Sequence, residues 1–402
     1  MSSAGELWTR IELLAADILC HTDDPKSTEQ QLSITRSQLN AILDPIGRLP
    51  LEISSDIFLH YLPTPPTWEA LSLLLLVSHA WNSIALSTPS LWNAIGDHRI
   101  PPARFTRVWE AWLDRGRDLP VSLSIRHIDR ASFASIATNF GKHAPRFQTM
   151  ELSPTGGTDL GRLTSRAHFG GLKSLTIQML DDSYGSLEPF LELLRGAPDL
   201  VECNIVGTTF LSASTSLTHS TLQHLRIGTM EQIFCDAFIL RHLTLPSLQT
   251  LCVSRYGIQV AHLHDFLVRS SPPLTSLQII LRVGDTTNET MRACLGLLGG
   301  LTDLGIVLPD AMASSLDLFT SAPHLLPVLQ SLTVYEVFGH IQEGCRRILD
   351  FLAKRHASLR SFRLIIPDGQ EEALGNADAP ALREFQDQGI QIHVGTEQMN
   401  FL

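Results

Sequence analysis

Nine copies of one short apolar pattern, evenly spaced, restrict the possible folds of this 402-residue sequence more than any other feature. Each copy has the form L-x-x-L-x-L, with other apolar residues in some of its places. Successive copies begin 25, 28, 22, 26, 26, 27, 28 and 30 residues apart, a regularity that is typical of repeat proteins. The copies are Phe147-Met150-Leu152, Leu172-Leu175-Ile177, Leu200-Cys203-Ile205, Leu222-Leu225-Ile227, Leu248-Leu251-Val253, Leu274-Leu277-Ile279, Leu301-Leu304-Ile306, Leu329-Leu332-Val334 and Leu359-Phe362-Leu364.

Each copy predicts a strand whose alternate side chains point into a core. Several strands are accompanied by apolar residues at the i, i+3, i+4, i+7 spacing of a core-facing helix. Because one strand and one helix cannot bury their own apolar faces, the copies must stack. We therefore expect an α/β solenoid with a parallel stack of strands over residues 121–366, closed by a C-terminal cap over 367–402. The helical sets are Leu187, Phe190, Leu191 and Leu194; Leu263, Phe266 and Leu267; Met291, Leu295 and Leu298; and Ile348, Leu349 and Leu352.

The repeats resemble leucine-rich repeats, with one departure. That family usually places Asn or Cys after the strand, where the side chain satisfies backbone groups of the turn. The resemblance implies an irregular strand-and-helix solenoid, and the missing polar ladder leaves its curvature open. The position after the strand here holds Leu180, Thr208, Met230, Tyr256, Arg282, Pro309, Val337 and Pro367.

The first 120 residues differ in composition from the repeats, because all six tryptophans lie before residue 113. Apolar residues at positions 7, 11, 14 and 18 predict an amphipathic helix, and positions 32, 39 and 42 continue the same frame after a break at 21–27. We expect a helical lead over residues 1–44, either a hairpin packed on its own protein or a short coiled coil, with the hairpin favoured. A helical connector is expected over residues 96–120.

Residues 45–95 form the most apolar part of this N-terminal region. Pro50 favours an extended backbone at Leu49 and a helix start just beyond it. The next helix is amphipathic and ends at a group of prolines, residues 63, 65 and 66. The helix that begins at Leu71 and runs to Val77 is apolar all round, which predicts burial on most sides. So small a unit exposes more apolar surface than it can hide, and such patches mark interfaces. An alternative is that it only caps the domain that follows.

The segment Leu49-Pro50-x-Glu52-Ile53-x-x-x-Ile57-Phe58, followed by Leu75-x-Val77-Ser78-x-x-Trp81, resembles an F-box. Its end, Pro89-x-Leu91-Trp92-x-x-Ile95, is similar to F-box proteins expanded in mushroom-forming (basidiomycete) fungi. The resemblance implies a three-helix F-box-like domain over residues 45–95 that docks on the Skp adaptor of cullin–RING (SCF-type) ubiquitin ligases, with Trp81 and Ile84 packed inside. The adaptor-binding residues it implies are Leu49, Pro50, Leu51, Ile53, Ile57, Phe58, Leu74 and Leu75.

A second candidate surface follows from the residue just after the last core position of each strand. In the last four repeats this position is apolar or aromatic, and the four should be neighbours in the stack. A groove for a target protein is predicted there, with Tyr335 as an aromatic anchor. The alternatives are that the C-terminal tail covers this stripe or that the residues reflect strand propensity alone. The predicted groove residues are Ile280, Val307, Tyr335 and Ile365, with Arg363 in the neighbouring column.

Charge and cysteine usage argue against several classes of partner. The formal net charge is −11, and residues 1–100 hold five Lys/Arg against eleven Asp/Glu. Without a basic patch, neither nucleic acid nor an anionic membrane is expected as a partner. The six cysteines form no C-x-x-C pair, and charged residues interrupt the apolar N-terminus. We expect an intracellular protein of the cytoplasm or nucleus, without a signal peptide.

No motif for catalysis, a metal or a phosphate-bearing cofactor is present. His262 and His264 are two residues apart on a predicted helix, so they face different ways and make a poor metal pair. The sequence therefore predicts a non-enzymatic protein without a cofactor. With the resemblance, it predicts a substrate-recognition subunit that holds the Skp-type adaptor at its N-terminal helices and an unknown target protein on its repeats. The alternative is a protein-interaction scaffold that assembles no ligase.

Overall fold

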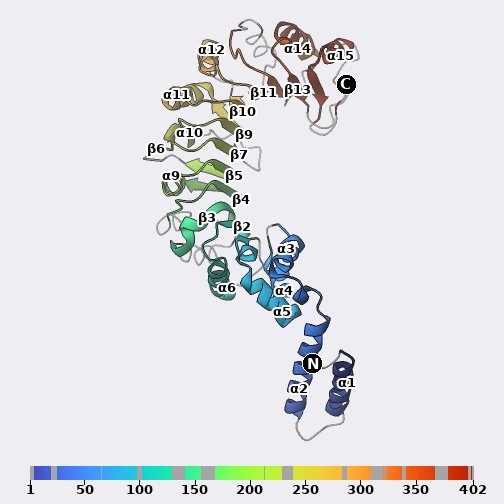
Figure 1. Cartoon of the computed structure of the whole chain (residues 1–402). Coiled ribbons are helices and arrows are strands. Elements are labelled where there is room, and N and C mark those ends of the chain that lie inside the picture. Colours follow the sequence, from blue (N-terminus) through green and yellow to red (C-terminus); the bar gives the residue numbers. More distant parts are fainter. Residues whose placement is uncertain are drawn as a thin grey trace. The chain divides into compact units, whose positions relative to one another are not determined.

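The chain forms two compact units in the computed structural model (Figure 1), residues 1–126 with 146–149 and residues 127–145 with 150–402. We call them the N-terminal and the C-terminal unit. The described residues are 4–19, 25–64, 66–96, 102–128, 141–154, 168–211, 213–228, 239–282, 288–308, 320, 322, 324–336, 341–366, 379–396 and 400.

Helices make up most of the N-terminal unit. Its second helix begins at Pro25, because proline fits the first helical turn. The elements are α1 (Ala4–Leu19), α2 (Pro25–Leu43), η1 (Ile46–Arg48), α3 (Leu51–Tyr61), α4 (Trp68–Val77), α5 (His79–Ser87), η2 (Pro89–Trp92), β1 (Ala94–Ile95), α6 (Pro102–Arg115) and β2 (Val121–Ile128).

Helices α1 and α2 pack against each other as a hairpin. Leu7, Ile11 and Leu14 of α1 form one buried apolar cluster with Leu32 and Leu39 of α2. These are the residues of the predicted stripe, so α2 of the same chain covers α1. The structure therefore has the predicted hairpin. A second chain is not needed to cover the apolar stripe, as it would be in a coiled coil.

A parallel sheet of twelve strands, in the order β1-β2-β3-β4-β5-β7-β9-β10-β11-β12-β13-β14, confirms the predicted parallel stack. Strands β6 (Leu217–Thr218) and β8 (Leu243–Thr244) form a separate pair. The remaining strands are β3 (Phe147–Pro154), β4 (Ser174–Ser186), β5 (Glu202–Leu211), β7 (His224–Gly228), β9 (Thr250–Gln259), β10 (Ser276–Arg282), β11 (Asp303–Leu308), β12 (Ser331–Glu336), β13 (Ser361–Ile365) and β14 (Gln391–Gly395).

The sheet begins earlier than the expected solenoid boundary at residue 121. Its first strand is β1, inside the segment assigned to the helical 45–95 domain, and Ile95 pairs with Leu123 of β2. The first repeat is also divided, because residues 146–149 belong to the N-terminal unit. Arg146 is bound within the N-terminal unit, because its guanidinium donates to the carbonyls of Leu113 at 2.8 Å and Leu119 at 3.1 Å.

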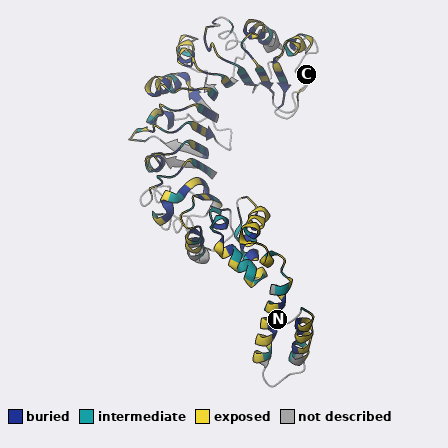
Figure 2. Ribbon diagram, viewed as in Figure 1, coloured by how far each residue is buried: buried dark blue, intermediate teal, exposed yellow. Residues whose placement is uncertain are grey.

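The nine predicted copies supply one continuous apolar core. Each of their 27 core residues is at most 4% exposed, and Figure 2 shows the buried residues following the strands. The first residues of the strands stay in register from repeat to repeat, so that Cys203 pairs with Leu175 on one side and Leu225 on the other. The register shifts farther along, after Gln178 of β4 and after Gln278 of β10. Because register is kept, alternate residues form unbroken buried columns.

Helices accompany the strands of the C-terminal unit, and Figure 1 shows α9, α10, α11 and α12 in a column beside the sheet. The residues predicted to face the core of the first of these helices, Leu187, Phe190, Leu191 and Leu194, are fully buried. Leu382 of α15 is also buried, as are Ile392 and Val394 of β14, which together cover the end of the core. The helices are α9 (Glu188–Arg195), α10 (Ile239–His242), α11 (Val260–Ser270), α12 (Asn288–Gly296), α14 (Ile341–Arg355) and α15 (Ala379–Asp387).

Side chains of later repeats replace the missing polar ladder at several turns. Arg269 donates to the carbonyls of Leu240 at 2.7 Å and Leu243 at 2.9 Å, both one repeat earlier. Arg355 does the same for Leu325 at 2.5 Å and Leu326 at 3.1 Å. Buried carbonyls need such partners, because an unsatisfied one costs about 1–3 kcal/mol. At these turns, arginine side chains thus make the hydrogen bonds to backbone groups that an asparagine ladder would otherwise make.

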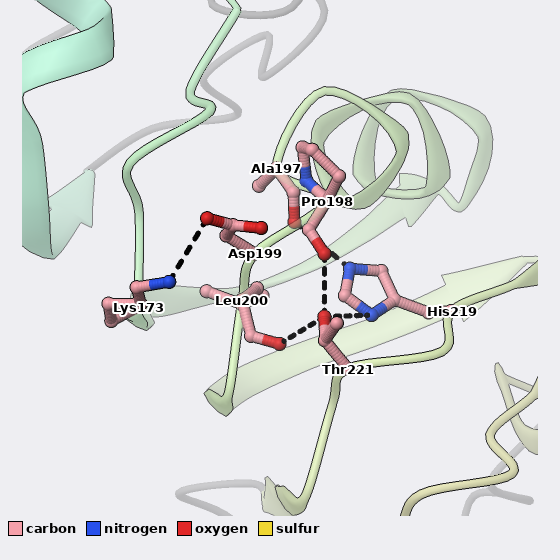
Figure 3. Close-up of polar contacts among 7 residues, drawn as sticks. All are labelled: Lys173, Ala197, Pro198, Asp199, Leu200, His219 and Thr221. Carbon is pink, nitrogen blue, oxygen red and sulfur yellow. Dashed lines mark hydrogen bonds and ion pairs between the residues drawn. The ribbon is translucent and has the colours of Figure 1, made fainter.

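His219 and Thr221 make the same kind of contact between β5 and β7 (Figure 3). The His219 ring Nε2 lies 3.0 Å from the carbonyl oxygen of Ala197, and the Thr221 hydroxyl lies 2.6 Å from that of Pro198. Burial lowers the pKa of His219, although hydrogen bonds to the carbonyls of Ala197 and Leu194 act in the opposite direction. A neutral imidazole in this place is a structural link between repeats.

Replacing Arg355 with Met should destabilise the C-terminal unit by about 2 kcal/mol, because two buried carbonyls lose their donor. One of these carbonyls belongs to Leu326, whose φ of 53° is itself unfavourable for a residue with a side chain. We expect a lower thermal midpoint and faster hydrogen exchange around residues 325–330. Arg360→Met, at an exposed arginine nearby, is the control. Equal effects of the two substitutions would contradict the role of Arg355.

Candidate functional site

One candidate surface is the apolar side of α3 and the two residues before it. Leu49 is 40% exposed, Ile53 48% and Ile57 39%. Ile53, Ile57 and the exposed Tyr61 are four residues apart, so they lie along one side of the helix. Leu49 is extended, with φ −79° and ψ 154°, and the helix starts directly after Pro50, as predicted. We call Leu49, Pro50, Ile53, Ile57 and Tyr61 the α3 face.

Two residues implied by the F-box resemblance do not belong to this surface. Phe58 is 1% exposed, and its ring lies 4.9 Å from the ring of Trp81. Leu74 is also 1% exposed. Phe58 follows Ile57 by one position, a turn of about 100° around the helix axis, which takes it from the exposed side to the core. Phe58 and Leu74 are therefore buried in the chain by itself, and their contact with a partner stays a prediction. Leu51 is exposed and Leu75 half-buried.

Helix α4 corrects a second expectation. We predicted burial on most sides, yet only Leu71 and Leu74, three residues apart, are buried. Leu76 is 80% exposed, and Leu73 and Val77 are exposed as well. An apolar helix with one covered side carries a second exposed apolar patch. An all-apolar sequence has no periodicity, so the sequence offered no sign of which side would be free.

The carboxylate of Asp44 holds the backbone that leads into the α3 face. Its oxygens accept hydrogen bonds from the backbone N–H groups of Ile46 at 2.9 Å and Gly47 at 3.2 Å. They also accept from the Ser78 hydroxyl at 3.0 Å and the Trp81 indole N–H at 3.1 Å, both at the start of α5. Burial raises the pKa of Asp44, but these four hydrogen bonds outweigh it and lower the pKa below its ordinary value of 3.8.

Asp44→Asn should lower the stability of the N-terminal unit by about 1–2 kcal/mol at neutral pH, because charge-assisted hydrogen bonds are lost. The folded-state pKa lies below the unfolded one, so the contribution of Asp44 is present above pH 3.8 and disappears as the pH falls through the folded-state value. The difference between wild type and variant should therefore shrink in acid.

Tryptophan fluorescence during urea unfolding measures this effect selectively, since all six tryptophans lie within residues 8–112. Asp56→Asn, at an exposed carboxylate of α3, is the control and should change stability little. A pH-independent difference between wild type and Asp44→Asn would refute the assignment.

The four strand residues of the predicted groove are neighbours across the sheet. Ile280, Val307, Tyr335 and Ile365 pair directly with one another across β10, β11, β12 and β13. Ile365 is only 7% exposed, whereas Ile280 and Tyr335 are half-buried. Val307 is placed by its backbone, and its side chain lies outside the described part of the chain.

Tyr335 is tied to the neighbouring row. Its hydroxyl accepts a hydrogen bond from Nε2 of Gln278 at 3.1 Å, although strand β11 lies between them. Gly305 of β11 makes this possible, because a Cβ there would lie 3.1 Å from Cγ of Gln278. A side chain on β11 would crowd the path of Gln278.

The neighbouring row is polar along most of the sheet. It lies on the face opposite the buried columns, which we call the open face, and Arg363 takes its predicted place there as an exposed residue. The row could be identified from the sequence by taking, in every repeat, the residue between the last two core positions of the strand. Arg363 is the member of this row that the predicted groove includes. Its members are Thr176, Asn204, Arg226, Cys252, Gln278, Gly305, Thr333, Arg363 and His393.

A depression of about 380 Å³ lies on the open face over β5, β7 and β9. Sequence reasoning placed its candidate groove farther along, at β10 to β13, where apolar residues drew attention. Polar residues line the depression, and none of them belongs to the predicted groove. The lining residues that face it with polar groups are Glu202, Asn204, His224, Arg226, Thr250 and Cys252.

The described residues meet the requirements of neither a metal site nor a membrane-spanning helix. Among them, no group of three or more His, Cys, Asp or Glu side chains could hold a metal ion. In the same part of the chain, no helix combines the length and apolarity that crossing a membrane requires. Comparison with protein-family models and with curated proteins returns no match.

Proposed function

We propose that this protein is a substrate-recognition subunit of an SCF-type ubiquitin ligase. The F-box-like helices would dock on the Skp adaptor, and the leucine-rich-repeat-like array would hold a target protein. The protein itself would carry out no catalysis, and it would act in the cytoplasm or nucleus.

The observation that carries the proposal is the α3 face. Exposed apolar side chains are costly unless a partner covers them, and a row of them on a short helix is typical of a docking surface. Ile53 and Ile57 remain 48% and 39% exposed in the fold of the chain itself, and Asp44 holds the segment that precedes them. This combination of a fixed backbone and uncovered apolar side chains favours a partner of defined shape.

The exposed patch of α4 adds to this support. Leu73, Leu76 and Val77 are uncovered in the same small unit. A partner that covers only α3 would leave them in water. We therefore expect the adaptor to contact both helices, with Phe58 and Leu74 supporting the surface from beneath.

The alternative remains a protein-interaction scaffold without ligase assembly. The two candidates differ in whether the α3 face captures the Skp adaptor. A scaffold would use the repeats in the same way, and its N-terminal helices would only end the array.

Co-expression with the Skp adaptor followed by size-exclusion chromatography tests the proposal. We expect a stoichiometric complex, which Ile53→Asp/Ile57→Asp should weaken at least about tenfold, because burying a charge at an interface costs more than 1.4 kcal/mol. Leu49→Ala/Pro50→Ala should weaken it as well. The two isoleucines are exposed, so the Asp variant should remain folded.

Val268→Asp is the matched control, since Val268 is 54% exposed but lies on α11 of the repeats. It should leave adaptor capture unchanged. A folded wild-type protein that ignores the adaptor would reject the ligase proposal in favour of the scaffold. A complex that survives the double Asp substitution would place the interface elsewhere.

A further inference from the structure

The depression over β5, β7 and β9 contains a cation, Arg226, that has no acidic partner among the described residues. Arg226 is exposed and contacts the thiol of Cys252. Among the residues that the structure describes, no carboxylate lies within ion-pairing distance of its guanidinium. The nearby carboxylate of Glu202 instead accepts a hydrogen bond from the Ser174 hydroxyl, on the side away from β7.

Cys252 does not neutralise this cation. Burial raises the pKa of the thiol, although the positive charge of Arg226 acts in the opposite direction. The thiol therefore stays protonated at neutral pH, and its hydrogen points to Oε1 of Gln278 at 3.3 Å. Gln278 in turn donates to Tyr335, so a chain of neutral groups holds this wall of the depression in place.

Asn204 adds an acceptor without a donor. Its Oδ1 is buried and has no hydrogen-bond partner. Asn204 pairs directly with Arg226 across β5 and β7, so the open acceptor and the cation adjoin each other. A buried acceptor without a partner costs about 1–3 kcal/mol, and native proteins usually satisfy such groups.

We propose that this depression binds an acidic side chain, Asp or Glu, of a bound polypeptide. The Arg226 guanidinium donates to the carboxylate, and the Asn204 amide turns toward the depression, so that its Oδ1, buried in the unbound chain, accepts an N–H group from the same segment. His224, exposed beside Arg226 on β7, is a further donor at the rim. The inference rests on the proposed function, because it names the chemistry that the repeats would recognise in a target protein.

The chemistry favours a polypeptide over a free anion or a basic segment. A free carboxylate would satisfy Arg226 but bring no donor for Asn204. A Lys or Arg side chain would supply that donor but face the charge of Arg226. A peptide that carries an acidic side chain supplies both groups within one residue. Glu202 at the far edge disfavours a second acidic residue there.

Selection of short random peptides displayed on phage against the purified full-length chain tests the proposal. We expect the selected peptides to share Asp or Glu at one position. Synthetic versions should bind with an affinity that Arg226→Ala lowers at least about tenfold, measured by fluorescence anisotropy. Asn204→Leu, which removes the acceptor at similar volume, should lower it as well. Selection against Arg226→Glu should enrich Lys or Arg at the same position.

Arg363→Ala is the matched control, because Arg363 is an exposed arginine of the same row and lies outside the depression. It should leave the affinity unchanged. The proposal is overturned if the wild-type chain selects no acidic consensus. It is also overturned if the selected peptides respond to Arg363→Ala or Tyr335→Ala and not to Arg226→Ala, which would place binding at β10 to β13.

This outcome is separable from the adaptor experiment. The peptide measurements use the chain without the adaptor, and Ile53→Asp/Ile57→Asp should leave peptide affinity unchanged. Peptide binding without adaptor capture would reject the ligase proposal and keep the acidic-segment site. Adaptor capture without an acidic consensus would support the ligase proposal and reject the acidic-segment site.

Discussion

One hydrogen-bond arrangement recurs along the C-terminal unit, and the rest of the unit depends on it. The carbonyl ahead of most strands of this unit accepts N–H groups from two successive residues of the next repeat. Lys173 does so for Val201 and Glu202, and Gln249 for Thr275 and Ser276. Each repeat thereby fixes where the strand of the next repeat begins. Because neighbouring strands begin in register, the side chains of equivalent residues form columns, apolar on one face of the sheet and mostly polar on the other.

The turns between repeats need additional hydrogen-bond donors, because their carbonyls are buried and no ladder of asparagines satisfies them. The chain satisfies several of them individually, with Arg146, His219, Arg269 and Arg355. These residues differ in length and geometry, and the spacings between repeats differ as well. An irregular solenoid is therefore stabilised by irregular contacts, each suited to its own turn.

The two candidate surfaces differ in their physics. The α3 face is apolar and exposed because a unit with so little interior cannot cover all its apolar side chains. The depression on the open face is polar and retains unmet hydrogen-bonding and ionic capacity, in Asn204 and Arg226. The first suits a permanent partner that excludes water from a large apolar area. The second suits selective recognition, in which a wrong partner leaves buried polar groups unpaired.

The sequence by itself determined the repeat length, the parallel stack, the buried columns and the apolar stripe of α1 and α2, because these follow from the periodicity of apolar residues. The structure decided that this stripe is covered within a hairpin. The sequence also placed Ile280, Tyr335 and Ile365 in one row, since equal offsets in a register-preserving array must be neighbours. Only the tertiary structure decided that Leu74 of α4 faces inward while Leu76 faces outward, because an all-apolar helix carries no signal of its covered side. It also decided that Phe58 of α3 packs on Trp81, a contact between two helices. Only the tertiary structure paired Gln278 with Tyr335 across Gly305 and left Asn204 without a donor. Contacts of that kind depend on side-chain positions in three dimensions, which periodicity does not encode.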